Sequence, residues 1–500
     1  MSDMHFGASN SLLTHIPDGQ TTPDPTRPSP PLVALVDCLE SVVATNEDRS
    51  VKPRLVLNGD ILEFALASDE TALAAFERFM ELAFRERDLF DRTIDYLPGN
   101  HDHHMWEMAR ERQYAAYVAR TPVTDRLGAP WHGTSMFQSA DPVKREARRV
   151  RAELVEAAIH RLPGLDDVAV DVHYPNFGLR SDEAPPDRAV VFHHGHFVEP
   201  VYKLMTTLRL GLFPDSTTGP YPWDIEAENF AWIDFVWSTL GRSGQWGADV
   251  GELYDMLQEE TAMQAVAANA SEALAASAGW PSWMPKRFRH QLSSRLARHF
   301  VANIAKRERG TPTTGPLSTA AAAGLQEYVD GPLSRNLADE CDGTVPRRLT
   351  FVFGHTHKAF ERSDHSTAYQ RPVAIYNTGG WVVDTLRPDI RQGAATILVD
   401  ENLDVASLHW YSQEIHQIIP PVNVAATGDH AGSEFVRRLR DGIDAQSDPW
   451  SRLTKEVAHA IPERERCLQT LIAQGAVAAK ARPGVDRRPG SHRPQGSIRS

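Results

Sequence analysis

Cysteine is scarce in this chain of 500 residues, and the three cysteines lie far apart in sequence, at Cys38, Cys341 and Cys467. Zinc sites built on C-x-x-C pairs and disulfide frameworks both need cysteines that recur at short spacings, so neither is indicated. Few cysteines are typical of a protein that folds in a reducing compartment. We therefore predict a cytoplasmic location.

The sequence also has no run of about 18 or more apolar residues and no charged-then-apolar N-terminal stretch, so we expect neither a membrane span nor an export signal. Basic residues are outnumbered, with 52 Lys and Arg against 66 Asp and Glu and a formal net charge of −14. Because nucleic-acid-binding domains are usually basic, nucleic acid is not an expected partner. An anionic substrate stays compatible with this charge, because bound metal ions can dominate a local field.

Apolar residues are sufficient for a sizeable core, since 41% of the chain is hydrophobic and 24% is charged. The length indicates one large domain with insertions, or two domains. Changes in composition and pattern predict an α/β body over 1–197 and 346–425, a helical insertion or cap over 198–345, a helical segment over 426–479 and a disordered basic tail over 480–500.

Hydrophobic periodicity predicts the elements of this body. Helices are expected over 32–44, 69–91, 104–119 and 142–161. Strands are expected over 54–58, 93–97, 168–172, 189–192, 348–353, 373–377, 394–399 and 405–411.

Five short polar stretches carry residues of metal-ligand type: Asp3-x-His5, Gly59-Asp60, Gly99-Asn100-His101-Asp102, His194-Gly195-His196 and Gly354-His355-x-His357. At least three of them directly follow a predicted strand, and open α/β sheets build their sites at strand carboxyl ends. Each stretch alone also fits a turn or a disordered terminus, but five in one chain favour a site. Carboxylate, imidazole and amide ligands without thiolate suit Mn, Fe or Zn ions.

Together these motifs resemble the signature of the calcineurin-like metallophosphoesterase superfamily. All five occur in the family's order between residues 3 and 357, and the turn Asn377-Thr378-Gly379-Gly380 extends the likeness. The resemblance implies an α/β fold of two packed mixed β-sheets flanked by helices. It also implies a hydrolase that cleaves a phosphomonoester or phosphodiester with two divalent metal ions, of which Mn²⁺ is the first candidate and Fe or Zn are alternatives.

The resemblance also implies a role for each motif residue. One metal would be held by Asp3, His5, Asp60 and His357, and the second by Asp60, Asn100, His194 and His355. His101 would be catalytic without being a ligand, and Asp102 would orient it. A metal-bridging hydroxide would be the nucleophile, because a water between two cations loses a proton easily. His196 could touch substrate.

One feature departs from the family pattern. The D-x-H loop normally follows a buried strand, but only Met1 and Ser2 precede Asp3 here. Our hypothesis is that the recorded start lies downstream of the true one. If the start is real, Asp3 and His5 are expected on a fraying terminus that holds the first metal weakly.

The predicted insertion lies between the H-G-H and G-H-T-H motifs, so it should lie beside the site and could select substrate. Within it, 283–309 is basic with an apolar residue every fourth position. Such a helix could contact a membrane surface or substrate phosphates, although packing as a cap helix with a solvated basic face is the favoured interpretation.

The stretch 59–64 resembles the UDP-2,3-diacylglucosamine pyrophosphatase branch, which favours a phosphorylated small-molecule or lipid-linked substrate. That branch usually has H-G-D where this chain has H-G-H, and it is much shorter.

Two alternatives remain. A nuclease of the same superfamily is disfavoured by the acidic balance and by the lack of a recognisable basic face on the core. A non-catalytic scaffold on the same fold could dispense with the catalytic imidazole, yet His101 and all the proposed ligands are present.

Overall fold

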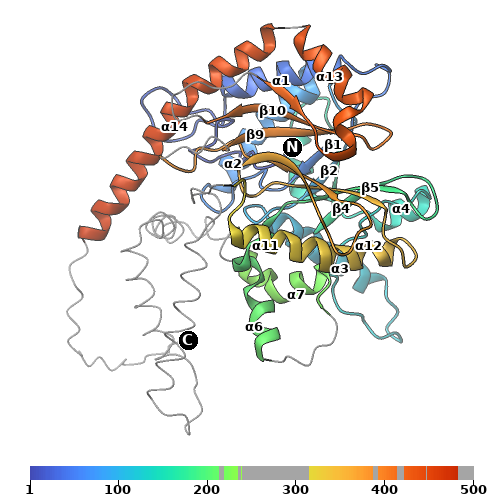
Figure 1. Cartoon of the computed structure of the whole chain (residues 1–500). Helices are drawn as coiled ribbons and strands as arrows, with labels where there is room; N and C mark the ends of the chain where they lie inside the picture. The colour runs from blue at the N-terminus through green and yellow to red at the C-terminus, as the bar shows by residue number, and fades with distance from the viewer. Residues whose placement is uncertain are drawn as a thin grey trace, which may run out of the picture.

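The structure is a computed structural model that describes residues 1–212, 219–234, 238, 315–386, 392–413, 422–445 and 447–481. The chain is α/β, as the sequence predicts, and the strands of the described residues lie in three sheets. In Figure 1 the strands lie between a helical layer that contains α1, α13 and α14 and a second one that contains α11 and α12.

The first sheet has three parallel strands in the order β1 (Leu55–Asn58), β2 (Thr93–Leu97) and β3 (Ala169–Val172). The second has the order β4 (Asn176–Arg180), β5 (Arg188–His193), β6 (Arg348–Phe353), β8 (Val373–Thr378) and β7 (Ala359–Asp364). Its central pairs β5–β6 and β6–β8 are parallel. Parallel strands end at the same edge of a sheet, so the loops after them are brought together.

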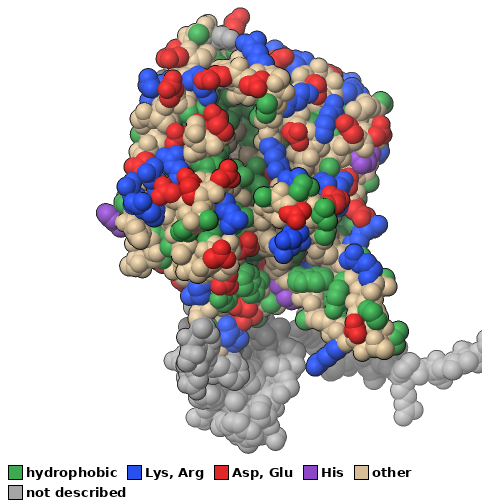
Figure 2. Space-filling model, turned by 90° about the vertical axis from the view of Figure 1, so that its right-hand side faces the viewer, with side chains coloured by type: hydrophobic (Ala, Val, Ile, Leu, Met, Phe, Trp, Pro, Cys, Tyr) green, Lys and Arg blue, Asp and Glu red, His purple; other side chains and the backbone are tan. Residues whose placement is uncertain are grey.

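The third sheet is antiparallel, with the order β11 (Asn423–Ala425), β10 (Val405–Ser412) and β9 (Gly393–Val399). Both β1 and β9 are edge strands, and an apolar groove with a volume of about 250 Å³ is lined by residues of both. Leu55 and Val56 line it from β1, and Ile397 and Leu398 from β9. Figure 2 shows a hollow with apolar side chains among mixed charges on this side of the molecule. The described residues therefore form three hydrogen-bonded sheets where the resemblance implies two.

The helices cover these sheets. In the first half they are α1 (Pro30–Val43), α2 (Asp69–Met80), α3 (His104–Arg120), α4 (Pro142–Arg148), α5 (Glu153–Ile159), α6 (Leu204–Leu212) and α7 (Pro222–Ile233). In the second half they are α11 (Thr319–Tyr328), α12 (Ser334–Glu340), α13 (Glu434–Asp444) and α14 (Asp448–Ala481). α1 shows how the sequence sets such an element, because Ser29 caps its first turn and Leu32, Leu35 and Leu39 are buried on one face.

Two predicted helices are shorter than expected. The helix over 69–91 ends at Met80 and continues as a π-helical turn, η1 (Glu81–Glu86). The helix over 142–161 is broken into α4 and α5, because the intervening residues pair with β3. Ala152 N donates to Val170 O at 3.0 Å, and Val172 N donates to Val150 O at 2.7 Å. Helical periodicity alone could not reveal this pairing.

Three strands were not predicted. β4 contains a glycine, β7 reads Ala-Phe-Glu-Arg-Ser-Asp without apolar alternation, and β11 has three residues. All three lie at sheet edges, where one side of the strand needs no partner and the sequence signal is weak.

Between β5 and β6 the described residues form no strand. Their helices include the 3₁₀ turns η2 (His196–Val198) and η3 (Pro200–Lys203) and the π turn η6 (Val329–Leu333). The domain boundaries stay a prediction. The basic stretch 283–309 lies outside the described residues, and so does nearly all of the predicted tail, from 482 to 500. Within the described part of the chain, no helix has both the length and the apolarity needed to cross a membrane.

Candidate metal centre

The N-terminal segment is buried and paired along its length. Asp3 is 0% exposed and His5 is 2% exposed. Asp3 N donates to Gly59 O at 2.9 Å, and His5 N donates to Asp60 O at 3.0 Å. Met4 and Phe6 alternate with them and are 0% exposed, so they anchor the segment in the core. The expectation that Asp3 and His5 lie on a fraying terminus is therefore wrong, because backbone pairing with the chain after β1 holds them in place.

The loops of the motifs share an unusual backbone conformation. Asp3, His5, Asp60, His355 and His357 all have φ between 46° and 68°. Non-glycine residues rarely adopt this left-handed region, and such strain concentrates at functional sites. Among the described non-glycine residues, only Asp88, Asp342 and Leu403 share it without belonging to a motif.

Four motif residues form a first group of possible metal ligands. One ligand atom from each of Asp3, His5, Asp60 and His357 lies within 4.8 Å of the others. His5 Nε2 lies 3.3 Å from His357 Nε2, and His357 Nε2 lies 3.1 Å from Asp3 Oδ1. Two imidazole nitrogens at this separation in a buried site can share one cation between their lone pairs.

The outer nitrogens of both rings face carboxylates. His5 Nδ1 lies 2.8 Å from Glu63 Oε2, and His357 Nδ1 contacts Asp384. A carboxylate accepts hydrogen bonds, so each Nδ1 carries the proton and each Nε2 is left with a lone pair. This is the arrangement that orients histidine ligands in metal sites. The first group therefore fits a divalent cation.

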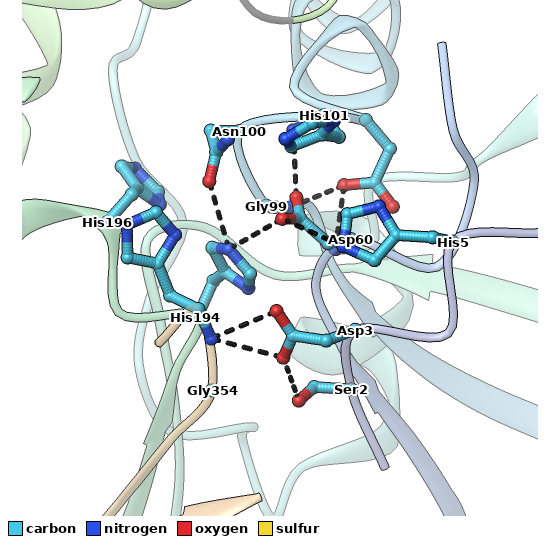
Figure 3. Close-up of polar contacts among 12 residues, drawn as sticks. Ser2, Asp3, His5, Asp60, Gly99, Asn100, His101, His194, His196 and Gly354 are labelled. Atoms are coloured by element: carbon cyan, nitrogen blue, oxygen red, sulfur yellow. Dashed lines mark hydrogen bonds and ion pairs between the residues drawn. The ribbon is translucent and has the colours of Figure 1, made fainter. Parts of the chain in front are cut away.

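A second group shares Asp60 with the first. One ligand atom from each of Asp60, His194 and His355 lies within 4.8 Å of the others. His194 Nε2 is 3.3 Å from Asp60 Oδ2 and 3.1 Å from Asn100 Oδ1. Figure 3 shows Asp60 and Asn100 directed toward the His194 ring. The structure thus brings together the seven residues that the resemblance assigns to two metals, with Asp60 common to both groups.

Charge within the centre favours a bound cation. Burial alone would lower the pKa of His194, but the Asp60 carboxylate outweighs it and raises this pKa to about 9. Burial would likewise raise the pKa of Asp60, yet the neighbouring His194 and His101 rings bring it well below the usual value. A cation would replace the His194 proton, so binding should release a proton.

His101 faces Glu63 and not Asp102. His101 is 3% exposed, and its Nδ1 lies 2.9 Å from Glu63 Oε1. The Asp102 carboxylate instead accepts from Gly99 N at 2.5 Å, from Ile61 N at 2.8 Å and from the Tyr96 hydroxyl at 2.5 Å.

The predicted role of Asp102 as the residue that orients His101 is therefore wrong. Its short side chain is committed to the backbone of the Gly59-Asp60 and Gly99-Asn100 loops, which it ties together.

Glu63 is a site residue that sequence reasoning missed. It is 1% exposed, and its two oxygens face His5 and His101. Burial would raise its pKa, but the charges and hydrogen bonds of the two histidines outweigh burial and lower it, so the carboxylate stays ionised. The sequence offered one signal for this residue, which is its position three residues after Asp60.

Two glycines allow the loops to approach each other. A Cβ atom on Gly99 would overlap the Asp60 carboxylate and the His194 ring. A Cβ atom on Gly354 would overlap the Asp3 carboxylate and the hydroxyls of Ser2 and Thr378. Glycine is needed at both positions because of close packing, not because of backbone conformation.

Two further buried residues, His196 and Glu199, lie beside the second ligand group. His196 Nε2 lies 3.1 Å from the Tyr174 hydroxyl, and the residue belongs to neither ligand group. Its proposed contact with substrate stays a prediction. Glu199 Oε1 lies 2.8 Å from His355 Nε2 and adds a buried carboxylate beside the second group.

A neighbouring network joins this centre to α7, which lies in the predicted insertion. His103 Nε2 lies 2.9 Å from Glu226 Oε1 on α7, and Glu226 also accepts from the Tyr174 hydroxyl at 2.8 Å. His103 and Glu226 are both 0% exposed. The helical segment after β5 is therefore tied directly to the loop that carries His101.

Searches of protein-family models and of curated proteins both returned no match to this chain.

Proposed function

We propose that this chain is a metal-dependent phosphoesterase of the calcineurin-like metallophosphoesterase superfamily, acting on a phosphomonoester or phosphodiester. The observation that carries the proposal is the pair of buried ligand groups that share Asp60. One carboxylate can bridge two cations through its two oxygens, and two cations about 3.5–4 Å apart can act on both the attacking and the leaving oxygen of a phosphoryl group.

The arrangement of layers supports the same proposal. The superfamily fold packs two mixed sheets between helices, and here helices lie on both sides of the strands (Figure 1). In our proposal the β1–β3 and β9–β11 sheets together correspond to one layer of that fold, with the five-stranded sheet as the other. The finding that β1 and β9 are edge strands beside one groove supports this correspondence.

The proposed metals would be held as the two groups indicate. Asp3, His5, Asp60 and His357 would hold one, and Asp60, Asn100, His194 and His355 the other. When bound, two divalent cations supply Lewis-acid stabilisation of phosphate charge and lower the pKa of water. Mn²⁺ is the first candidate and Fe or Zn are alternatives, because the donor set is carboxylate, imidazole and amide.

The remaining chemistry belongs to the chain's own side chains. With a proton on both ring nitrogens, His101 would donate through Nδ1 to Glu63 and through Nε2 to a phosphoryl or leaving oxygen. Glu63 would fix the orientation of that ring and, at the same time, the orientation and tautomer of His5. The Asp60 carboxylate, through its Oδ1 contact with His101 N at 2.8 Å, sets the spacing between the catalytic loop and the ligands.

The test is hydrolysis of p-nitrophenyl phosphate and of its bis ester by protein loaded with Mn²⁺. His101→Ala should lower the rate by about 10²–10⁴-fold and leave the metal content unchanged. His459→Ala is a matched control, since that side chain is 78% exposed on α14.

Two results would contradict the proposal. Absence of hydrolysis of either ester by metal-loaded protein would favour a scaffold without catalysis. A His101→Ala variant that loses its metal together with its activity would show that His101 is a ligand.

A further inference from the structure

A basic groove lies on the side of α3, outside the proposed metal centre. It has a volume of about 670 Å³ and is lined by α3, by the connection that contains Trp131, by α4 and by the end of β3. Six arginines and three carboxylates line it, so its net charge is +3 in a chain whose net charge is −14. The arginines are Arg112, Arg120, Arg145, Arg148, Arg149 and Arg151, and the carboxylates are Glu146, Glu153 and Asp171.

The carboxylates of the groove are already paired. Arg149 Nε lies 2.8 Å from Asp171 Oδ1, and Arg149 also binds Glu146. Glu153 pairs with Arg112. By contrast, Arg120, Arg145 and Arg148 form no ion pair with any residue of the described chain, so the excess positive charge lies on them.

The charged helix is presented to solvent. α4 has no buried residue, and Asp141 caps its first turn by accepting from Val143 N at 2.9 Å. Arg145 and Arg148 lie three residues apart on α4, so they lie on the same side of the helix. Two guanidinium groups on one exposed face suit a ligand with repeated phosphates, because guanidinium binds phosphate oxygens in a bidentate manner.

Aromatic side chains line the same groove. Tyr117 and Trp131 pack edge to face with ring centroids 5.3 Å apart, and Trp131 is 41% exposed. Exposed aromatic rings beside arginines are the combination that stacks unpaired bases of single-stranded nucleic acid while holding its phosphates. An acidic peptide would use the arginines but not the rings, and a duplex has no unstacked bases to offer.

We propose that this groove binds single-stranded nucleic acid. α3 begins at His104, directly after the loop of His101 and Asp102, and Arg112 lies eight residues further along the helix, about 12 Å away. The groove therefore lies on the helix that leads directly from the loop of the proposed centre. The binding itself does not depend on the phosphoesterase proposal, because none of the groove arginines or aromatics belongs to the ligand groups.

The test uses the full chain after treatment with EDTA. The probe is a fluorescein-labelled oligothymidylate of about 20 nucleotides. Fluorescence anisotropy should show binding that weakens as salt rises. The double variant Arg145→Ala, Arg148→Ala should lower the slope of log K against log salt by about 1.4, since each single-strand phosphate contact contributes about 0.7. Trp131→Ala should weaken binding by at least about fivefold with an unchanged salt slope.

The control is the double variant Arg437→Ala, Arg466→Ala, whose side chains are 66% and 70% exposed on α13 and α14. It removes the same charge elsewhere and should bind as the wild type does. The inference is overturned if the wild type does not bind, or if the control loses as much affinity as the groove variant. Equal displacement of the oligonucleotide by polyglutamate would also overturn it, because a general polyanion site would then be present. If the protein binds the oligonucleotide but does not hydrolyse the esters, only the proposed function is contradicted.

Discussion

Replacing Glu226 with Gln tests how strongly the helix α7 holds the loop of His101. Glu226 is 0% exposed and its Oε1 lies 2.9 Å from His103 Nε2. Asp234 Oδ1 lies 3.5 Å from the other ring nitrogen of His103 and is the nearest substitute. The substitution keeps the shape of the side chain and its contact with the Tyr174 hydroxyl, so it removes mainly the charge.

The magnitude follows from the buried charge pair. Burial alone would lower the pKa of His103, but Glu226 and Asp234 outweigh it and raise this pKa to about 10. His103 is therefore protonated at neutral pH. Removing one partner of a buried pair typically costs about 3–5 kcal/mol, and the remaining Asp234 places the expected loss near 3 kcal/mol at pH 7.

The pH dependence gives a second, independent signature. The pKa of His103 is raised on folding, from an unfolded value of about 6.5. Its contribution to stability is therefore fully present below pH 6.5 and is lost as the pH rises through about 10. The difference between wild type and Glu226→Gln should shrink in the same interval.

The assay is urea denaturation at pH 7 and near pH 10.5, with His103→Gln and the double variant to complete a cycle. Glu434→Gln, with an 83% exposed side chain, serves as the control. The reasoning is refuted if Glu226→Gln is as stable as the wild type at pH 7. A stability loss that is the same at both pH values would show that the ion pair is not its cause.

Two further substitutions test the centre itself. Glu63→Gln should weaken metal binding by about 10–100-fold and also lower kcat, because Glu63 faces both His5 and His101. Calorimetric titration with Mn²⁺ and ester hydrolysis measure the two effects. Asp384→Asn alters a carboxylate that contacts the proposed ligand His357, and it should affect metal binding alone. If Glu63→Gln binds Mn²⁺ as the wild type does, Glu63 does not orient His5. Gly354→Ala should destabilise the fold by about 1–3 kcal/mol, since its Cβ would overlap the Asp3 carboxylate; urea denaturation measures this, and an unchanged midpoint would contradict the close packing.

Local pattern was a good guide where an element is decided by its own residues. The capped apolar face of α1 and the apolar runs of β2 and β6 occur close to the predicted bounds. The break that separates α4 from α5 was not predictable, because Val150 and Ala152 pair with β3, some 20 residues away in sequence. The edge strands β4 and β7 were missed because an edge position relaxes the apolar alternation.

The sequence by itself determined which residues could form the centre. Motif spacing placed Asp60, Asn100, His194 and His355 after strands, and parallel strands bring such loops to one edge. Only the tertiary structure decided how those side chains are directed.

Asp102 is three residues from Gly99 and turns back to the backbone, whereas Glu63, distant from His101 in sequence, lies against its ring. The arginines of α3 and α4 likewise form one basic groove although more than twenty residues separate the helices. The reason in each case is that side-chain partners and surface charge depend on distances in space, which local periodicity does not encode.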